Sequence, residues 1–281
     1  MDFAGPARWA LMVITCVGLT SAAGAQSLVD RGRSLMQGVV ACGNCHTPLT
    51  PNGPAPGMEL AGRLMADEPP FTAYAPNITP DPETGIGRWT DEQIIAAIRE
   101  GKRPDGSIIG PPMPIPFYRG MSDDDAKAIV AYLRQVPAVR NQVARSVYRI
   151  PLPANYGPPV GAVAAPPRTD RLAYGAYLAG PLGHCLECHS ARLPNGAPDI
   201  ASGLGAGGMT FNGPWGISHA ANLTPTNLAR YRDDQVKAMI TTGKRPDGSS
   251  MLPPMAYGFY RNIPADDLDA IVAFLRTLPA K

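Results

Sequence analysis

Two copies of one short motif constrain this chain more than any other feature. Each copy has two cysteines separated by two residues, and a histidine follows the second cysteine directly. The first copy, CGNCH, contains Cys42, Cys45 and His46, and the second, CLECH, contains Cys185, Cys188 and His189. Because the histidine recurs at the same place, the motif must serve a chemistry that uses two thiols and one imidazole together.

The sequence around the two motifs also repeats. The segment GKRPDGS occurs unchanged at 101–107 and 243–249, and a Pro-Pro-Met segment follows it in both places. Matched signals in the same order indicate two copies of one domain. We predict these domains at 26–136 and 168–281, joined by an extended, Pro-rich linker at 137–167.

Helices are predicted before each motif and at the end of each copy. The segments before the motifs cover 27–40 and 170–180. The final helices have the clearest pattern, because apolar residues recur at i, i+3, i+4 and i+7 within 126–133 and 268–275. Ser122 is placed to cap the first of these final helices.

A third helix is predicted in the middle of each copy. In the first copy it begins near Thr90, where Gln93 completes a capping box, and it ends at Gly101. No segment shows a convincing alternation of polar and apolar residues, and Gly- and Pro-rich loops fill the rest. The predicted fold class is therefore all-α, with two tandem domains.

The first residues, 1–25, have the pattern of a secretory signal peptide. Arg8 precedes the apolar run 9–20, and the tripeptide that ends at Ala25 is an A-x-A cleavage site. Cleavage there would remove Cys16, whereas an uncleaved signal would act as an anchor. No later segment is apolar for long enough to span a bilayer. We expect a periplasmic protein, free or peripherally attached to the inner membrane.

Three kinds of site use cysteines at this spacing. A structural zinc site needs four ligands, yet Cys45 and the adjacent His46 cannot easily share one ion, and the other motif lies in the other copy. A thioredoxin-like switch requires alternating strands and helices, which this sequence lacks. Haem attachment explains all three residues, since the thiols add to the porphyrin vinyl groups and the histidine ligates the iron. We therefore predict two covalently bound haem c groups.

With these motifs, the chain resembles tandem class I cytochromes c. The resemblance rests on CGNCH, CLECH, the two Pro-Pro-Met segments and the two final helices, and it covers the whole mature sequence. It implies a helix before each attachment site that crosses the final helix, and a loop that carries a sixth iron ligand. His46 and His189 are the expected ligands on the opposite side of each iron.

The expected sixth ligands are Met113 and Met255. They align without a gap, follow Pro-Pro and precede the final helix, where the family has its ligand. A methionine ligand raises the reduction potential of the haem. Met65 and Met209 nearly align and are the alternatives. In the second copy His219 is a further alternative, and it would lower the potential of that haem.

Irons with two protein ligands have no open position for a substrate, so the resemblance implies electron transfer, and no catalytic residue is assigned. The sequence is also similar to cytochrome c subunits of periplasmic dehydrogenases. We expect such a dehydrogenase as electron donor, and another cytochrome, an oxidase or a quinone-linked complex as acceptor. A formal net charge of +2 indicates no nucleic-acid partner. The alternative is a dihaem redox enzyme, peroxidase-like or thiosulfate-oxidising, with one open or labile haem.

Overall fold

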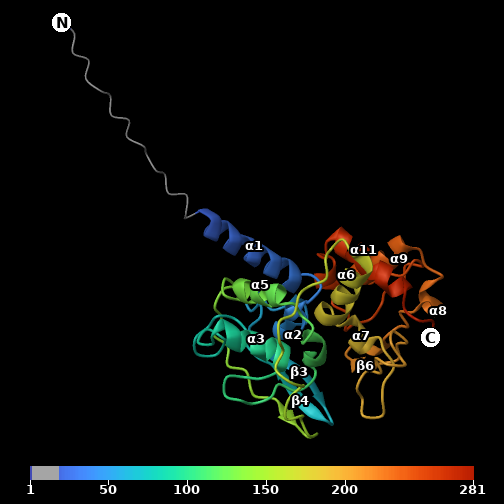
Figure 1. Cartoon of the computed structure of the whole chain (residues 1–281). Coiled ribbons are helices and arrows are strands. Elements are labelled where there is room, and N and C mark those ends of the chain that lie inside the picture. The colour runs from blue at the N-terminus through green and yellow to red at the C-terminus, as the bar shows by residue number, and fades with distance from the viewer. Residues whose placement is uncertain (2–18) are drawn as a thin grey trace.

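The computed structural model describes Met1 and residues 19–281. Most of the predicted signal segment, residues 2–18, lies outside this described part, and Cys16 with it. Helices contain far more of the described residues than strands do, as the predicted fold class requires, and they gather in two halves that lie side by side (Figure 1). Within the same residues, no helix is both long and apolar enough to cross a membrane.

The first half is built on two crossing helices. Helix α1 (Leu19–Met36), which ends earlier than the predicted 27–40, packs across α5 (Asp123–Leu133). At the crossing, an added Cβ atom on Gly32 would lie 1.9 Å from the carbonyl oxygen of Ala128. Only glycine permits so close an approach of two helix backbones. The shorter helices of this half are α2 (Cys42–His46), α3 (Asp91–Glu100) and α4 (Ile115–Tyr118).

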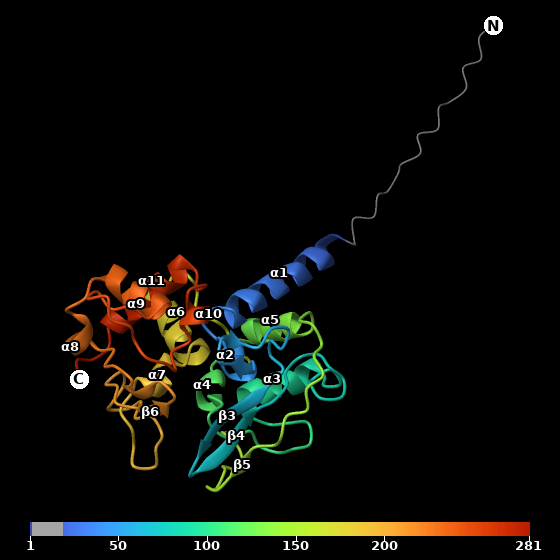
Figure 2. The ribbon, with the colours of Figure 1, turned by 180° about the vertical axis from the view of Figure 1, so that it is seen from behind.

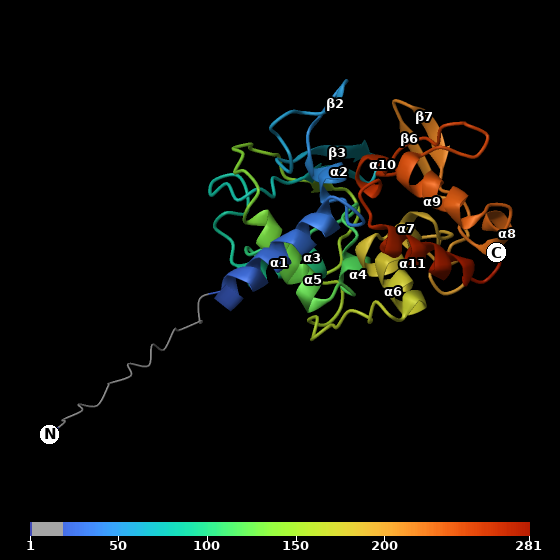
Figure 3. The ribbon, with the colours of Figure 1, turned by 90° about the horizontal axis from the view of Figure 1, so that it is seen from above.

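The second half contains the same kind of crossing. Helix α6 (Arg171–Tyr177) packs across α11 (Ala265–Arg276), and a Cβ atom on Gly175 would lie 2.0 Å from the Ala270 carbonyl oxygen. Figure 3 shows both crossings in one view. The shorter helices here are α7 (Cys185–Cys188), α8 (Pro225–Leu228), α9 (Asp233–Thr242) and α10 (Tyr257–Tyr260).

Local sequence explains where several helices begin and end. The predicted capping box at Thr90 is present, since its hydroxyl accepts from the Gln93 amide while the Gln93 side chain accepts from the Thr90 amide. Ser122 caps α5 as predicted, by accepting from the Asp125 amide at 3.1 Å. Gly101 ends α3 with φ at 65°, a left-handed conformation that glycine adopts without steric cost.

The helix predicted at 170–180 is shorter than expected. It is a regular α-helix only to Tyr177, and a wider turn, η1 (Leu178–Leu182), follows it. Pro181 explains this difference, because it has no backbone N–H with which to continue the α-helical ladder. The amide of Gly183 bonds the first carbonyl of η1 at 2.8 Å, which is the longer spacing of a π-bulge.

Short strands correct the expectation that the loops contain none. They are β1 (Leu49–Thr50), β2 (Gly53–Pro54), β3 (Arg63–Glu68), β4 (Phe71–Ala75), β5 (Val147–Tyr148), β6 (Thr210–Gly213) and β7 (Gly216–His219). They form antiparallel sheets in the orders β1–β2, β3–β4–β5 and β6–β7. The expectation was wrong because these strands are short, and in β3 exposed and half-buried residues do not alternate regularly.

The predicted linker, 137–167, lies along the first half. Its strand β5 pairs with the outer edge of β4. The ring of Tyr148 packs against Gly110, where an added Cβ atom would meet it at 2.6 Å. Further on, the Tyr156 hydroxyl donates to the Ile109 carbonyl at 2.8 Å. These two contacts place the linker against the loop after α3, and Figure 2 shows the yellow-green linker strand β5 beside β4.

The two halves share one hydrophobic core. Buried side chains of both halves, such as Met121 and Leu182, belong to one continuous cluster. Polar contacts add to this junction: the Tyr177 hydroxyl donates to Asp125 Oδ2 at 2.7 Å. Arg31 holds the same carboxylate through two bonds, of 2.7 and 3.0 Å. The halves therefore pack as one body.

Candidate functional site

The first motif forms helix α2 and ends it with a buried histidine. His46 is only 7 % exposed, and its Nδ1 donates to the Pro76 carbonyl oxygen at 2.8 Å. Because Nδ1 carries the proton, Nε2 keeps a free lone pair. Burial lowers the pKa of His46, and the Pro76 bond opposes this effect. The ring is thus a neutral, oriented donor that can bind a metal through Nε2.

The second motif has the same geometry. His189 is also 7 % exposed, its Nδ1 donates to the Ala221 carbonyl at 2.7 Å, and burial lowers its pKa. In each half a glycine amide bonds the carbonyl oxygen of the histidine, at 2.6 Å from Gly62 to His46 and at 2.8 Å from Gly207 to His189. A Cβ atom on either glycine would lie 2.6 Å from backbone atoms. These close approaches hold both motifs against the following loop.

The thiols of the two motifs are partly buried and form no disulfide. Burial raises the pKa of both Cys42 and Cys188 to about 12. Redox-active cysteines have lowered pKa values, so this environment argues against a thiol switch. Among the described residues, no three His, Cys, Asp or Glu side chains gather as a metal site. Two thiols beside an imidazole with a free Nε2 fit haem c.

Met113 and Met255 occupy matching places in the two halves. Each follows a Pro-Pro pair and precedes a short helix, α4 or α10, and both side chains are half-buried against the core. The Met113 carbonyl accepts from the Ile115 amide at 2.8 Å, and the Met255 carbonyl accepts from the Tyr257 amide at 3.0 Å. Met121, by contrast, is fully buried and fills the core.

The alternative sixth ligands lie on the hairpins. Met65 belongs to β3, and Met209 precedes β6, where the Arg192 guanidinium contacts its sulfur. His219 is exposed on β7, with its Nδ1 2.9 Å from the Thr210 hydroxyl. The His219 ring therefore lacks the burial that both motif histidines have.

Helices α2 and α7 lie near the junction of the two halves (Figures 1 and 2). Here the Tyr118 ring meets the His184 ring edge-on, with ring centres 5.8 Å apart, and His184 Nδ1 lies 3.3 Å from Glu187. Burial raises the pKa of Cys45, Arg63 opposes this rise, and Glu187 of the other half adds to it. The Glu187 carboxylate of the second motif therefore lies near the first motif.

The groups that orient the motif histidines were not predicted from the sequence. Pro76 and Ala221 supply backbone acceptors, and they begin the segments PNITP and ANLTP. The first segment is braced by Asn77, whose side chain accepts from the Thr79 amide at 2.9 Å, and the second has the same bond at 2.7 Å. The match between these segments is the signal that could have identified them.

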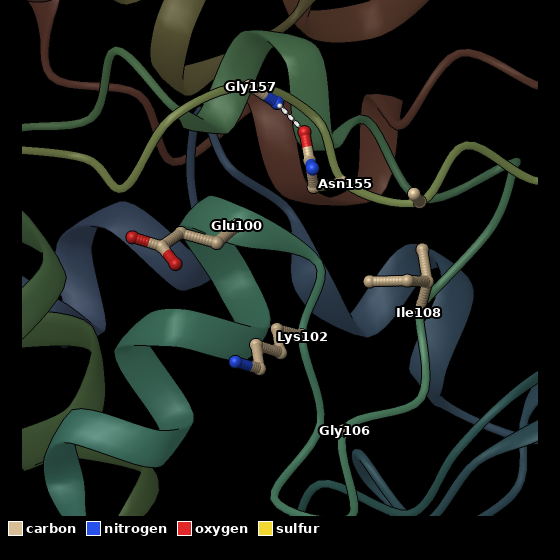
Figure 4. A pocket seen from close by; sticks show the side chains of 7 residues that line it. Glu100, Lys102, Gly106, Ile108, Asn155 and Gly157 are labelled. Carbon is tan, nitrogen blue, oxygen red and sulfur yellow. Dashed lines mark hydrogen bonds between the residues drawn. The ribbon is translucent and has the colours of Figure 1, made fainter.

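A pocket in the first half is separate from this site. It lies between the loop after α3 and the linker, with Glu100, Lys102 and Ile108 on one side and Asn155 and Gly157 on the other (Figure 4). Within the linker, the Gly157 amide donates to Asn155 Oδ1 at 3.0 Å. Since no motif residue lines it, the pocket is not part of the candidate site.

Comparison with known proteins shows what the chain is similar to. The family model described as Cytochrome c matches residues 29–137. A diheme cytochrome c-type protein of Cereibacter sphaeroides is 32% identical over 257 residues, which cover 85% of this chain and 82% of that protein.

Two longer proteins are similar as well. A nicotinate dehydrogenase subunit of Pseudomonas putida is 34% identical over 275 residues, covering 93% of this chain and 22% of that protein. The cytochrome c subunit of alcohol dehydrogenase (quinone) of Gluconobacter oxydans is 32% identical over 277 residues, covering 91% of this chain and 55% of that protein. The chain thus spans about half or less of the length of these two relatives.

Proposed function

Because the chain belongs to the cytochrome c family, we propose that it binds two haem c groups covalently and passes single electrons from a dehydrogenase to another redox protein. A bound haem supplies this chemistry by alternating between ferric and ferrous iron. The chain contributes the attachment points, the axial ligands and a partly enclosed environment. The proposed domains remain 26–136 and 168–281, with the linker at 137–167.

The observation that carries this proposal is the matched pair of buried histidines. His46 and His189 each donate Nδ1–H to a backbone carbonyl, which leaves Nε2 to bind iron. A hydrogen bond at Nδ1 fixes the ring orientation and makes Nε2 a stronger donor. The proposed thioether attachments are Cys42 with Cys45, and Cys185 with Cys188.

Met113 and Met255 are the proposed sixth ligands. Their matched positions after Pro-Pro support this role, and so does their half-buried state at the edge of the core, where each sulfur can turn toward a cofactor. Ligation of both irons by His and Met leaves no position for a substrate. We therefore assign electron transfer to the chain and no catalytic residue.

The proposed donor follows from the names of the relatives. Similar chains are named as subunits of alcohol dehydrogenase and nicotinate dehydrogenase. We propose that this chain receives electrons one at a time from a periplasmic dehydrogenase and delivers them to another cytochrome, an oxidase or a quinone-linked complex. The proposed signal peptide at 1–25, cut after Ala25, would direct it to the periplasm.

The test of haem binding uses protein from a bacterial host that attaches haem to exported proteins. Pyridine haemochrome spectra and protein mass should give two haems per chain. The paired variants Cys42→Ser/Cys45→Ser and Cys185→Ser/Cys188→Ser should each retain one haem. Two haems in either paired variant, or fewer than two in the wild type, would contradict the proposal.

The test of the sixth ligands uses the weak near-infrared band of methionine sulfur on ferric haem. Met113→Leu and Met255→Leu should each remove about half of this band. Met65→Leu and Met209→Leu are the matched controls and should leave it unchanged. Rapid binding of carbon monoxide by the reduced wild type would reveal an open iron and refute the relay function.

A further inference from the structure

A cation with no ion-pair partner among the described residues lies beside the first motif. Arg63 donates from Nη2 to the Asn44 carbonyl, inside the motif, at 3.0 Å, and from Nη1 to the Leu64 carbonyl at 3.2 Å. Its Nε is buried and has no acceptor. In the described part of the chain, no carboxylate forms an ion pair with Arg63. The guanidinium is therefore held in place by neutral carbonyl groups.

The second motif has a different charge at both corresponding positions. Gly208 corresponds to Arg63, because each follows the glycine whose amide bonds the motif histidine. Glu187 corresponds to Asn44, because each immediately precedes the second cysteine of its motif. The first motif thus has a cation where the second has a glycine, and a neutral amide where the second has a carboxylate.

A cation is also present near the second motif, but it acts at a different place. Arg192 donates to the Gly196 carbonyl at 3.1 Å and contacts the Met209 sulfur. Both of these partners lie outside the second motif, whereas Arg63 bonds a carbonyl inside the first.

Arg63 is fixed against the first motif at two places. Its guanidinium bonds the Asn44 carbonyl inside the motif, and the amide of its neighbour Gly62 bonds the His46 carbonyl at 2.6 Å. A charge held against the attachment motif also acts on an iron bound there. Because Arg63 is half-buried, solvent screens its field less than that of an exposed cation.

We propose that Arg63 raises the reduction potential of the haem at the first motif above that of the haem at the second, so that electrons pass from the second half to the first. This inference rests on the proposed function. Reduction adds one negative charge, which a fixed cation stabilises. One electron leaves the second haem and one arrives at the first, so no further oxidant or reductant is required.

The test is a spectroelectrochemical titration of the holoprotein. Arg63→Gln should make the first haem roughly tenfold harder to reduce, a change of about 59 mV for one electron. Arg192→Gln is the matched control and should change the potential of the first haem much less. The single-haem variant Cys185→Ser/Cys188→Ser assigns the first haem, since its one potential belongs to that site.

Further variants separate charge from hydrogen bonding. Arg63→Lys keeps the cation and should retain most of the wild-type potential. Glu187→Gln removes the anion and should raise the potential of the second haem more than that of the first. This variant also tests the inference if the Arg63→Gln protein fails to load haem. A wild type whose first haem has the lower potential would overturn the inference, as would a first haem that Arg63→Gln leaves unchanged. Failure of the proposed function is distinct, because it appears as fewer than two haems.

Discussion

Substitution of Gly32 by alanine should weaken the first half at its central helix crossing. The added Cβ atom would lie 1.9 Å from the Ala128 carbonyl oxygen and 2.8 Å from the Tyr132 Cβ atom. A carbonyl in the middle of α5 cannot move alone, because it belongs to the hydrogen-bonded backbone of that helix. The two helices must therefore separate or tilt.

The distances set the size of this effect. Ordinary contact begins at 3.4 Å, so the helices must separate locally by 1.5 Å, the difference between 3.4 and 1.9 Å. Overpacking of this kind costs about 3 kcal/mol at the upper end of its usual range. Alanine recovers about 1 kcal/mol through its better helix propensity. The net loss of about 2 kcal/mol should lower Tm by about 4–8 °C for a chain of this size.

Thermal unfolding of the holoprotein, followed by far-UV circular dichroism, measures this change. Gly175→Ala should cause a similar loss, since its Cβ atom would lie 2.0 Å from the Ala270 carbonyl oxygen. Gly258→Ala is the control, because a Cβ atom there meets nothing within 4 Å, and its Tm should not fall. A Gly32→Ala protein that unfolds at the wild-type temperature would refute the reasoning.

Two further predictions concern polar groups at the junction and in the second half. Tyr177→Phe removes the hydroxyl that donates to Asp125 and accepts from the Ser122 amide at 3.0 Å. Urea unfolding should therefore show a free energy of unfolding that is lower by about 1–3 kcal/mol. A decrease below about 0.5 kcal/mol would contradict this role. Burial raises the pKa of Asp267 above its usual 3.8, and Arg168 opposes the rise. This carboxyl therefore stabilises the fold below pH 3.8 and loses that contribution as the pH rises through its folded value. The Tm of Asp267→Asn minus the Tm of the wild type should accordingly be larger at pH 7 than at pH 4. The same difference at both pH values would count against a raised pKa of Asp267.

The helices could be predicted because their signals are local. The capping residues Thr90 and Ser122 lie within three residues of the amides they bond, and glycine ends α3 at Gly101. The strands could not be predicted in this way. β5 contains only Val147 and Tyr148, and it exists because the linker returns to the edge of β4, which is far away in sequence. No periodicity within two residues can indicate such a pairing.

The candidate site shows the same division. The motif residues are recognisable from spacing alone, whereas the acceptors at Pro76 and Ala221 are backbone carbonyls, which any residue type provides. Arg63 was not singled out, because its contact with Asn44 is created only when the loop folds back over the motif. The ligand roles of the methionines and the domain boundaries stay predictions.

The position of the linker makes the surfaces of the two halves different. A molecule with two similar halves would ordinarily present each surface twice. In the first half, the edge of β4 is paired with β5, and Tyr148 covers Gly110. In the second half, as far as the structure describes it, β7 has no strand on its outer edge, and Leu252, which takes the place of Gly110, is 43 % exposed. The exposed edge of β7 with Leu252 is therefore a surface that the described structure presents once per chain and not twice.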